Sequence, residues 1–363
     1  MAIPVPSARV AKFEKQAFGM FIHWGLYSQL GQGEWVQHLK NIPMEEYARL
    51  KDTFTADEFD AGQIARMAKR AGMKYIVLTT RHHDGFSLYD TRGLSDYDAP
   101  HSAAKRDLIA EFVKGCREEG ITPFFYHTTL DWYQPSFKDD FDGYLEYLRA
   151  SVEVLCTHYG EIGGLSVTFE QGRPEPMNRE GMSKYVSAEM CQTINGHWGF
   201  GRHDFSNKST GELIANLAAC RKVGANYLLN VGPQAGGRIS KLQEATLEVI
   251  GDWIEMYGQL IYDGKPSRVQ GQGSNFALET DDGKTYLFVH DLTIDGHANV
   301  TAAVGGVGPR VFMDVTAPVS SVRWLDNNEE LAFTHDADSG LLCFHATGYP
   351  YGDNFVVRVA VIS

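Results

Sequence analysis

Histidine and aromatic residues follow three apolar runs of this sequence, where β-strands are expected to end. His23 closes the first run, His82 and His83 follow the second, and Tyr126 ends the third. Because the carboxyl ends of parallel strands meet at one face of a β/α barrel, these side chains are expected to line one pocket. Imidazole and phenol groups pair with hydroxyls, and aromatic rings cover the C–H faces of a sugar. The pattern therefore indicates a carbohydrate site.

Simpler interpretations of the individual residues compete with this one. A single histidine at a strand end is more often a hydrogen-bonded core residue, which leaves His23 evenly balanced between the two roles. Glu34 and Trp35 follow Gly33 in a loop, where a glutamate is usually solvated. Trp198 is a core aromatic by default, but the glycines near it let its ring approach a ligand closely.

The adjacent histidines raise the question of a metal site. Neighbouring residues of a strand point to opposite faces, which argues against joint coordination by His82 and His83. No nearby pattern of Glu, Asp and His completes a zinc triad. No metal and no other cofactor is therefore expected.

Two glutamates are the candidates for acid–base chemistry. Glycoside hydrolysis needs two carboxyl groups beside one bond, roughly 5–5.5 Å apart for retention and 6.5–9.5 Å for inversion. Glu170 and Glu189 are the plausible carboxyls in the second half of the expected barrel. The largely apolar neighbours of Glu189 would raise its pKa toward that of a general acid. Spacing alone does not pair the two residues.

The elements that must position these residues alternate between short apolar runs and amphipathic helices. This alternation, from residue 18 to about 265, predicts a (β/α)8-type barrel with parallel strands. Helices are expected at Phe59–Gly72, Asp107–Gly120, Tyr144–Tyr159, Gly211–Val223 and Lys241–Leu260. Strands are expected at Phe18–Trp24, Lys74–Thr80, Thr122–His127, Gly164–Val167 and Ala225–Val231.

One junction breaks the alternation. Between Gly163 and Glu170 two strand-like pieces abut with no helix between them. A parallel sheet needs a crossover of a dozen or more residues at such a point. The sequence contains roughly six or seven β/α units, whereas a closed barrel has eight. The missing units are expected at this junction.

After Pro266 the sequence no longer alternates between apolar runs and amphipathic helices. Short strands separated by Asp, Gly and Asn turns predict a small all-β domain, a sandwich, at residues 266–363. The barrel domain is then expected at residues 1–265. The expected strands are Phe276–Thr280, Tyr286–Asp291, Val322–Leu325, Leu341–His345 and Phe355–Ile362.

Composition narrows the class of partner. The formal net charge of −13 argues against a nucleic-acid partner, which would call for a basic face. No stretch is apolar enough to predict a membrane segment or a secretion signal. The five cysteines are scattered, without metal-type spacing, and favour free thiols in a reducing cytoplasm. The oligomeric state stays open.

The motifs themselves resemble those of the α-L-fucosidases of glycoside hydrolase family 29. The resemblance covers nearly the whole barrel half, in segments that together are highly specific. These segments are Phe18–Ser28, Tyr75–Phe86, Ser95–Tyr97, Lys105–Leu108, Phe125–Trp132, Glu189–Gly199 and Gly224–Pro233. The resemblance implies a barrel followed by a sandwich, and hydrolysis of terminal α-L-fucosides with retention and without metal.

The same resemblance implies roles for individual residues. The positions that match the fucose pocket of the family are His23, Glu34, Trp35, His82, His83 and Tyr126. Trp198 would lie near the C6 methyl group. The acid/base position differs among members of the family, and it matches Glu189 first and Glu170 second.

One part of the family pattern has no counterpart here. The family's fourth strand carries an Asp nucleophile, but here Leu165 is followed by Ser166 and then by sequence that resembles a region well beyond that Asp. Three explanations stay open: the sequence omits a segment that the protein contains, the protein is a deletion variant, or a neighbouring carboxylate substitutes.

The sequence thus predicts a retaining exo-α-L-fucosidase that acts on fucosylated oligosaccharides or glycoconjugates. A catalytically impaired fucose-binding protein on the same scaffold is the alternative. A third interpretation, an unrelated metal-dependent barrel hydrolase, predicts metal in the purified protein.

Overall fold

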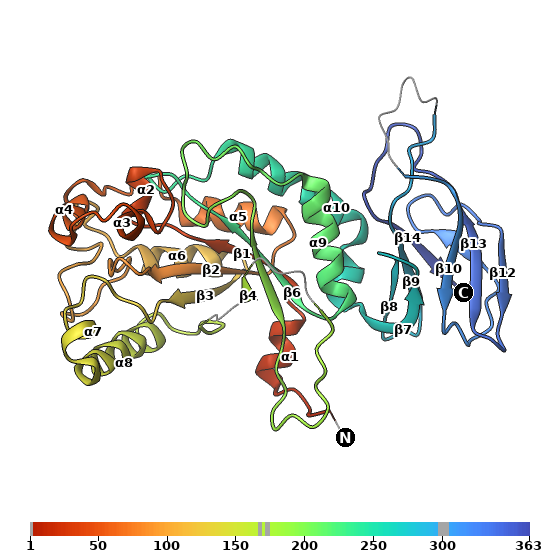
Figure 1. The fold of residues 1–363 in the computed structure, drawn as a ribbon, viewed down its shortest axis with the longest axis horizontal. Coiled ribbons are helices and arrows are strands. Elements are labelled where there is room, and N and C mark those ends of the chain that lie inside the picture. The colour runs from red at the N-terminus through yellow and green to blue at the C-terminus, as the bar shows by residue number, and fades with distance from the viewer. Residues whose placement is uncertain (1–2, 166–168, 171–174, 297–304) are drawn as a thin grey trace.

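The protein consists of a parallel sheet with helices and an antiparallel sheet beside it (Figure 1). The computed structural model describes residues 3–165, 169–170, 175–296 and 305–363. Helix α10 (Lys241–Asp263) ends next to the start of β7 (Lys265–Gly271), close to the predicted boundary at residues 265 and 266. In the described part of the chain, no helix is both long and apolar enough to cross a membrane.

Among the described residues, the parallel sheet contains six strands in the order β3-β2-β1-β6-β5-β4. Every pairing between them is parallel. The strands are β1 (Phe18–Ile22), β2 (Tyr75–Arg81), β3 (Thr122–His127), β4 (Phe169–Glu170), β5 (Glu189–Thr193) and β6 (Asn226–Val231). Leu165 adds a parallel bridge to Phe125 at the outer edge of β3.

Helices follow these strands as the alternation predicts. The longer ones are α5 (Ala61–Arg70), α6 (Leu108–Glu118), α8 (Phe141–Thr157), α9 (Thr210–Lys222) and α10. Side-chain caps set their starts: the Asp60 carboxylate accepts the Gln63 N–H at 2.8 Å, and the Asp107 carboxylate accepts that of Ala110 at 2.9 Å. Shorter helices lie at α1 (Ala8–Glu14), α2 (Tyr27–Leu30), α3 (Val36–Leu39), α4 (Met44–Ala48) and α7 (Ser136–Asp139).

The central strands are buried on both faces, as in a sheet that is covered on both sides. All residues of β1, β2 and β6 are buried. A cluster of Phe21, Tyr75, Val77, Phe124, Cys191 and Leu228 has Phe13 of α1 packed against it, as well as Tyr126 and Trp198. A single packed layer therefore connects α1 to the region where the predicted site residues lie.

The described strands form an open sheet. Its edges are β4 on one side and β3 with Leu165 on the other. The predicted break in the chain lies between these edges, and residues 166–168 and 171–174 of that region are outside the described residues.

In the described part of the chain, the antiparallel sheet has eight strands in the order β11-β14-β9-β8-β7-β10-β13-β12. Besides β7 they are β8 (Phe276–Glu279), β9 (Thr285–Val289), β10 (Gly308–Met313), β11 (Val322–Trp324), β12 (Phe333–Asp336), β13 (Leu341–Ala346) and β14 (Arg358–Ile362). Phe276, Phe288 and Val359 belong to the same buried cluster as α9 and α10. The Trp253 indole N–H of α10 also donates to the Phe355 carbonyl at 2.9 Å. The two sheets therefore share a continuous core.

Candidate active site

A small cavity of about 90 Å³ lies at the carboxyl ends of β1, β2 and β3. Its walls are Phe21, His23, Glu34, Trp35, His82, His83, Tyr126 and Trp198. The structure thus brings together all seven residues that the sequence indicated for sugar binding. Sequence reasoning missed Phe21, because an apolar residue inside a strand looks like ordinary core. Its ring centroid lies 4.3 Å from that of His23.

His23 is held in one orientation by Asn230 at the end of β6. The His23 Nδ1 lies 2.7 Å from Asn230 Oδ1, and Asn230 Nδ2 donates to the Trp198 carbonyl at 2.8 Å. Because the amide nitrogen donates to a carbonyl, its oxygen must be the acceptor for His23. This network assigns the proton to Nδ1 of His23 and leaves its Nε2 as an acceptor.

His82 and His83 both line the cavity, although neighbours in a strand point to opposite faces. Strand β2 ends at Arg81, so His82 and His83 lie beyond it. The alternation of side chains between the two faces of a strand therefore does not apply to them. Their ring centroids are 4.2 Å apart. His83 Nδ1 lies 2.5 Å from Thr128 Oγ1, whereas the buried His82 Nδ1 has no hydrogen-bond partner among the described residues.

Burial keeps these imidazoles neutral. Desolvation lowers the pKa of His23 to about 3 and that of His83 to about 4. Desolvation, with smaller contributions from His83 and His23, also lowers the pKa of His82 well below its usual value. Neutral rings offer one donor and one acceptor nitrogen each, which suits hydroxyl groups better than anions.

The loop after β5 supports the opposite wall of the cavity. It pairs with the loop after α2 through a bridge between Gln32 and Gly201. Glu34 is buried and its Oε2 accepts the Gly199 N–H at 2.8 Å. A Cβ at Gly199 would lie 2.8 Å from the ring of Tyr27, so the loop approaches this closely only with glycine there.

A buried ion pair fixes the segment beyond β3. Arg81 and Asp131 lie 3.2 Å apart and are almost fully buried. The Asp131 carboxylate also accepts the N–H groups of Tyr133 at 3.0 Å and Gln134 at 2.9 Å. The Trp132 N–H donates to the His83 carbonyl at 2.7 Å. This segment therefore lies against the histidine wall.

Asp84 is a buried carboxyl group beside this wall that the sequence did not single out. It accepts the Tyr47 hydroxyl at 2.8 Å, and burial raises its pKa to about 6. It does not line the cavity. The run His82-His83-Asp84 is the sequence signal that could have pointed to this residue. In the structure, however, the Asp84 carboxylate accepts hydrogen bonds from the Tyr47 hydroxyl and the Phe86 N–H.

Glu189 is not brought to the cavity. It is the first residue of β5, whereas Thr193 at the other end of β5 pairs with Asn230. Four residues of strand separate the two ends by roughly 13 Å. Glu189 Oε1 instead accepts the Tyr75 hydroxyl at 2.5 Å, at the start of β2. The acid/base role that the sequence suggested for Glu189 does not fit this position.

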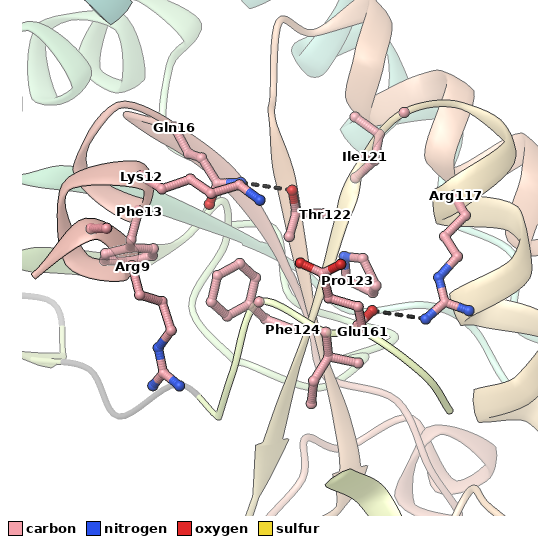
Figure 2. Close-up of a pocket in the computed structure, with 14 residues that line it drawn as sticks. Arg9, Lys12, Phe13, Gln16, Arg117, Ile121, Thr122, Pro123, Phe124 and Glu161 are labelled. Atoms are coloured by element: carbon pink, nitrogen blue, oxygen red, sulfur yellow. Dashed lines mark hydrogen bonds between the residues drawn. The ribbon is translucent and has the colours of Figure 1, made fainter. Parts of the chain in front are cut away.

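The amino ends of the strands hold pockets of their own. One, of about 540 Å³, lies between α1 and the start of β3, beside Phe13 and Phe124 (Figure 2). Glu189 lines an adjoining pocket that shares both of these aromatic residues. The apolar neighbours of Glu189 therefore lie at the amino ends of the strands, not beside the cavity at their carboxyl ends.

Glu170 lies in β4, where its backbone pairs with Cys191 of β5. Its side chain is outside the described residues, so its predicted catalytic role stays a prediction. Among the described residues, no group of three or more His, Cys, Asp and Glu side chains is placed to hold a metal ion.

Comparison with known proteins gives the relationship that this geometry suggests. The sequence profile described as Alpha-L-fucosidase matches residues 6–161 and 149–259. The chain belongs to the α-L-fucosidase family. The two matched stretches meet at residues 149–161, immediately before the predicted break.

Relatives and solved structures of this fucosidase family extend over both sheets. The tissue α-L-fucosidase of Bos taurus is 26% identical over 72% of this chain and 70% of its own. That of Rattus norvegicus is 25% identical over 91% of this chain and 84% of its own. The α-L-fucosidase isoenzyme 1 of Paenibacillus thiaminolyticus superposes with a TM-score of 0.83, at 28% identity, over 98% of both chains. The predicted fold class, a TIM-like barrel followed by a β-sandwich, is confirmed.

The comparison with the rat enzyme also gives the number of aligned positions that have no counterpart in this chain. It spans 407 aligned positions, while 91% of the 363 residues here is about 330. About 77 aligned positions therefore have no residue of this chain. One β/α unit needs about 30 residues or more, so this number is large enough for barrel elements.

Acidification should destabilise this fucosidase through His23. Its folded pKa of about 3 lies below the ordinary 6.5, so the unfolded chain binds more protons as the pH falls below 6.5. Between pH 7 and pH 5 the free energy of unfolding should fall by about 2 kcal/mol more in wild type than in His23→Asn. Urea unfolding at both pH values measures this difference. Equal pH dependence in the two proteins would contradict the assignment of a neutral His23.

Replacing Glu189 in this fucosidase should affect stability and not sugar binding. Glu189→Gln replaces a charged acceptor of the Tyr75 hydroxyl with a neutral one. The free energy of unfolding should fall by about 1–2 kcal/mol. The affinity for α-L-fucose, measured by calorimetry, should stay within twofold of wild type. A large loss of affinity or turnover, with stability unchanged, would return Glu189 to the catalytic site.

Proposed function

We propose that this protein recognises and hydrolyses terminal α-L-fucosyl residues, with the fucose held in the cavity between Phe21 and Trp198. The observation that carries the proposal is the convergence of three neutral imidazoles and four aromatic rings on one small cavity at the carboxyl ends of parallel strands. The family relationship supports it, since the matched relatives carry the name α-L-fucosidase.

The chemistry of the cavity walls suits a deoxy-sugar. His23 presents an acceptor at Nε2, and the His82 imidazole lines the same cavity, where it can pair with a hydroxyl of the ligand. Phe21, Tyr126 and Trp198 give flat apolar surfaces for C–H groups and a methyl group. Burial of the walls removes competing water, which makes unpaired polar groups costly and recognition selective.

Hydrolysis needs more than this recognition. A retaining glycosidase uses two carboxyl groups roughly 5–5.5 Å apart. Among the described residues that line the cavity, Glu34 is the one carboxylate, and it already accepts the Gly199 N–H. We infer that a further carboxylate enters from the region of the break, which lies just after residues 149–161, where the two stretches matched by the family profile overlap.

A fucose-binding protein without turnover is the second candidate. The single carboxylate among the described cavity residues favours it, because recognition without a pair of carboxyl groups gives binding alone. Both candidates predict that α-L-fucose binds.

Turnover of 4-nitrophenyl α-L-fucoside separates the two candidates. An enzyme releases 4-nitrophenol and gives the α-anomer of fucose as its first product. Binding of fucose by calorimetry with no 4-nitrophenol released would establish the second candidate. An intact mass that exceeds the 40.4 kDa of this sequence by several kDa would show that the working protein contains further residues.

The proposed compartment is a reducing cytoplasm. None of the five cysteines lies in a disulfide, and Cys116, Cys191 and Cys220 are buried in the core. Alkylation of freshly lysed cells should label five thiols per unfolded chain. Fewer than five would count against this compartment.

A further inference from the structure

The cavity is too small for more than one sugar residue, so the rest of a substrate must lie outside it. Its volume of about 90 Å³ compares with roughly 300–1,000 Å³ for pockets that enclose drug-sized ligands. The exit can be found from the exposure of the walls. Phe21, His23, Glu34, His82 and His83 are at most 9% exposed, Tyr126 and Trp198 are half-buried, and Trp35, at 37%, is the most exposed wall. A ligand held in the cavity therefore reaches solvent along Trp35.

Aromatic rings continue outward from Trp35. Its ring centroid lies 5.3 Å from that of Trp132 and 5.6 Å from that of His38. The rings of His38 and Trp132 are themselves stacked, 5.1 Å apart with an angle of 23° between their planes. His38 is exposed and Trp132 is half-buried. These three residues form what we call the Trp35–His38–Trp132 surface.

The supports of this surface are rigid. Trp35 and His38 are joined by one turn of α3, because the Leu39 N–H donates to the Trp35 carbonyl at 3.0 Å. Trp132 is held from the other side by its N–H bond to the His83 carbonyl, next to the buried Arg81–Asp131 pair. Rings fixed in this way lose little conformational freedom when a ligand binds.

We propose that the Trp35–His38–Trp132 surface binds the sugar residue to which the terminal fucose is attached. This inference rests on the proposed function and adds a second subsite to it. A pyranose offers the surface its C–H face, and the ring nitrogens of His38 and the indoles offer hydrogen bonds to its hydroxyls. Contacts to this non-reacting part of the substrate raise its affinity above that of fucose alone.

The test compares fucose with fucosyl disaccharides on the full chain. Binding of α-L-fucose and of α1,2-, α1,3-, α1,4- and α1,6-linked fucosyl disaccharides is measured by calorimetry for wild type, Trp132→Ala and His38→Ala. Wild type should bind at least one disaccharide more than fivefold tighter than fucose. Both variants should lose at least fivefold of that affinity, while fucose affinity changes less than twofold. Tyr351→Ala, which removes an exposed aromatic in the turn between β13 and β14, is the matched control and should change neither.

The outcomes separate the inference from the proposed function. Equal losses for fucose and disaccharide in His38→Ala would show that the rings only support the cavity wall, which overturns the inference. Unchanged disaccharide affinity in both variants overturns it as well, and in either case fucose binding by wild type leaves the proposed function standing. Failure of wild type to bind fucose at all overturns the proposed function first.

Discussion

Replacing His82 with phenylalanine is expected to weaken the binding of α-L-fucose by about 5- to 150-fold, which corresponds to about 1–3 kcal/mol. The His82 ring lines the cavity and its buried Nδ1 has no hydrogen-bond partner among the described residues, so we expect this imidazole to pair with a ligand hydroxyl. Phenylalanine keeps the aromatic volume between Tyr27 and His83 and removes both nitrogens. The measurement is titration calorimetry with α-L-fucose at pH 7.

A matched control separates recognition from general damage. His203→Phe changes an exposed histidine outside the cavity, so it should leave fucose affinity unchanged. If His82→Phe binds fucose as tightly as wild type and unfolds at the same urea concentration, His82 does not contact the sugar.

Replacing Asn230 with leucine should weaken fucose binding by about 10- to 100-fold without touching the sugar. The Asn230 side chain accepts from His23 and donates to the Trp198 carbonyl, and leucine has neither group. His23 then loses its fixed tautomer, and the Trp198 loop loses an anchor. Each unsatisfied buried group costs about 1–3 kcal/mol.

The conservative variant Asn230→Asp distinguishes positioning of His23 from a purely structural role, because only positioning changes how fucose affinity depends on pH. A carboxylate still accepts from His23 Nδ1, so fucose affinity should recover in part at high pH. The negative charge also raises the pKa of His23, so affinity should fall on acidification at a higher pH than in wild type. Fucose affinities of Asn230→Asp and wild type that change identically between pH 8 and pH 5 would exclude this positioning role.

The barrel-like part was predictable where apolar runs had clear limits. The strand expected at Thr122–His127 coincides with β3, because Gly120 and the polar residues after His127 bound a buried run. Strand β5 was not predicted, since Glu-Met-Cys-Gln-Thr has neither alternation nor β-branched residues over most of its length. Its neighbours β4 and β6 supply the pairing that the local sequence does not encode.

The placement of the candidate binding residues in one cavity was predictable from the sequence, whereas the placement of Glu189 was not. The positions of His23, His82 and Tyr126 at strand ends predict that they lie close together, because the carboxyl ends of parallel strands meet at one face of the barrel. Glu189 was chosen by its apolar neighbours, a criterion that holds equally at the amino end of a strand. Only the strand bounds distinguish the two ends, and those bounds were missed. Asn230 was visible as a strand-end residue, but its link to His23 is a tertiary contact.

The most direct test of the account is a crystal structure of the protein with α-L-fucose bound. The account predicts one fucose in the cavity, with hydroxyl oxygens within hydrogen-bond distance of His82 Nδ1 and His23 Nε2, and with its ring edge or methyl group against Trp198. Fucose bound elsewhere, with this cavity empty at saturating sugar, would contradict it.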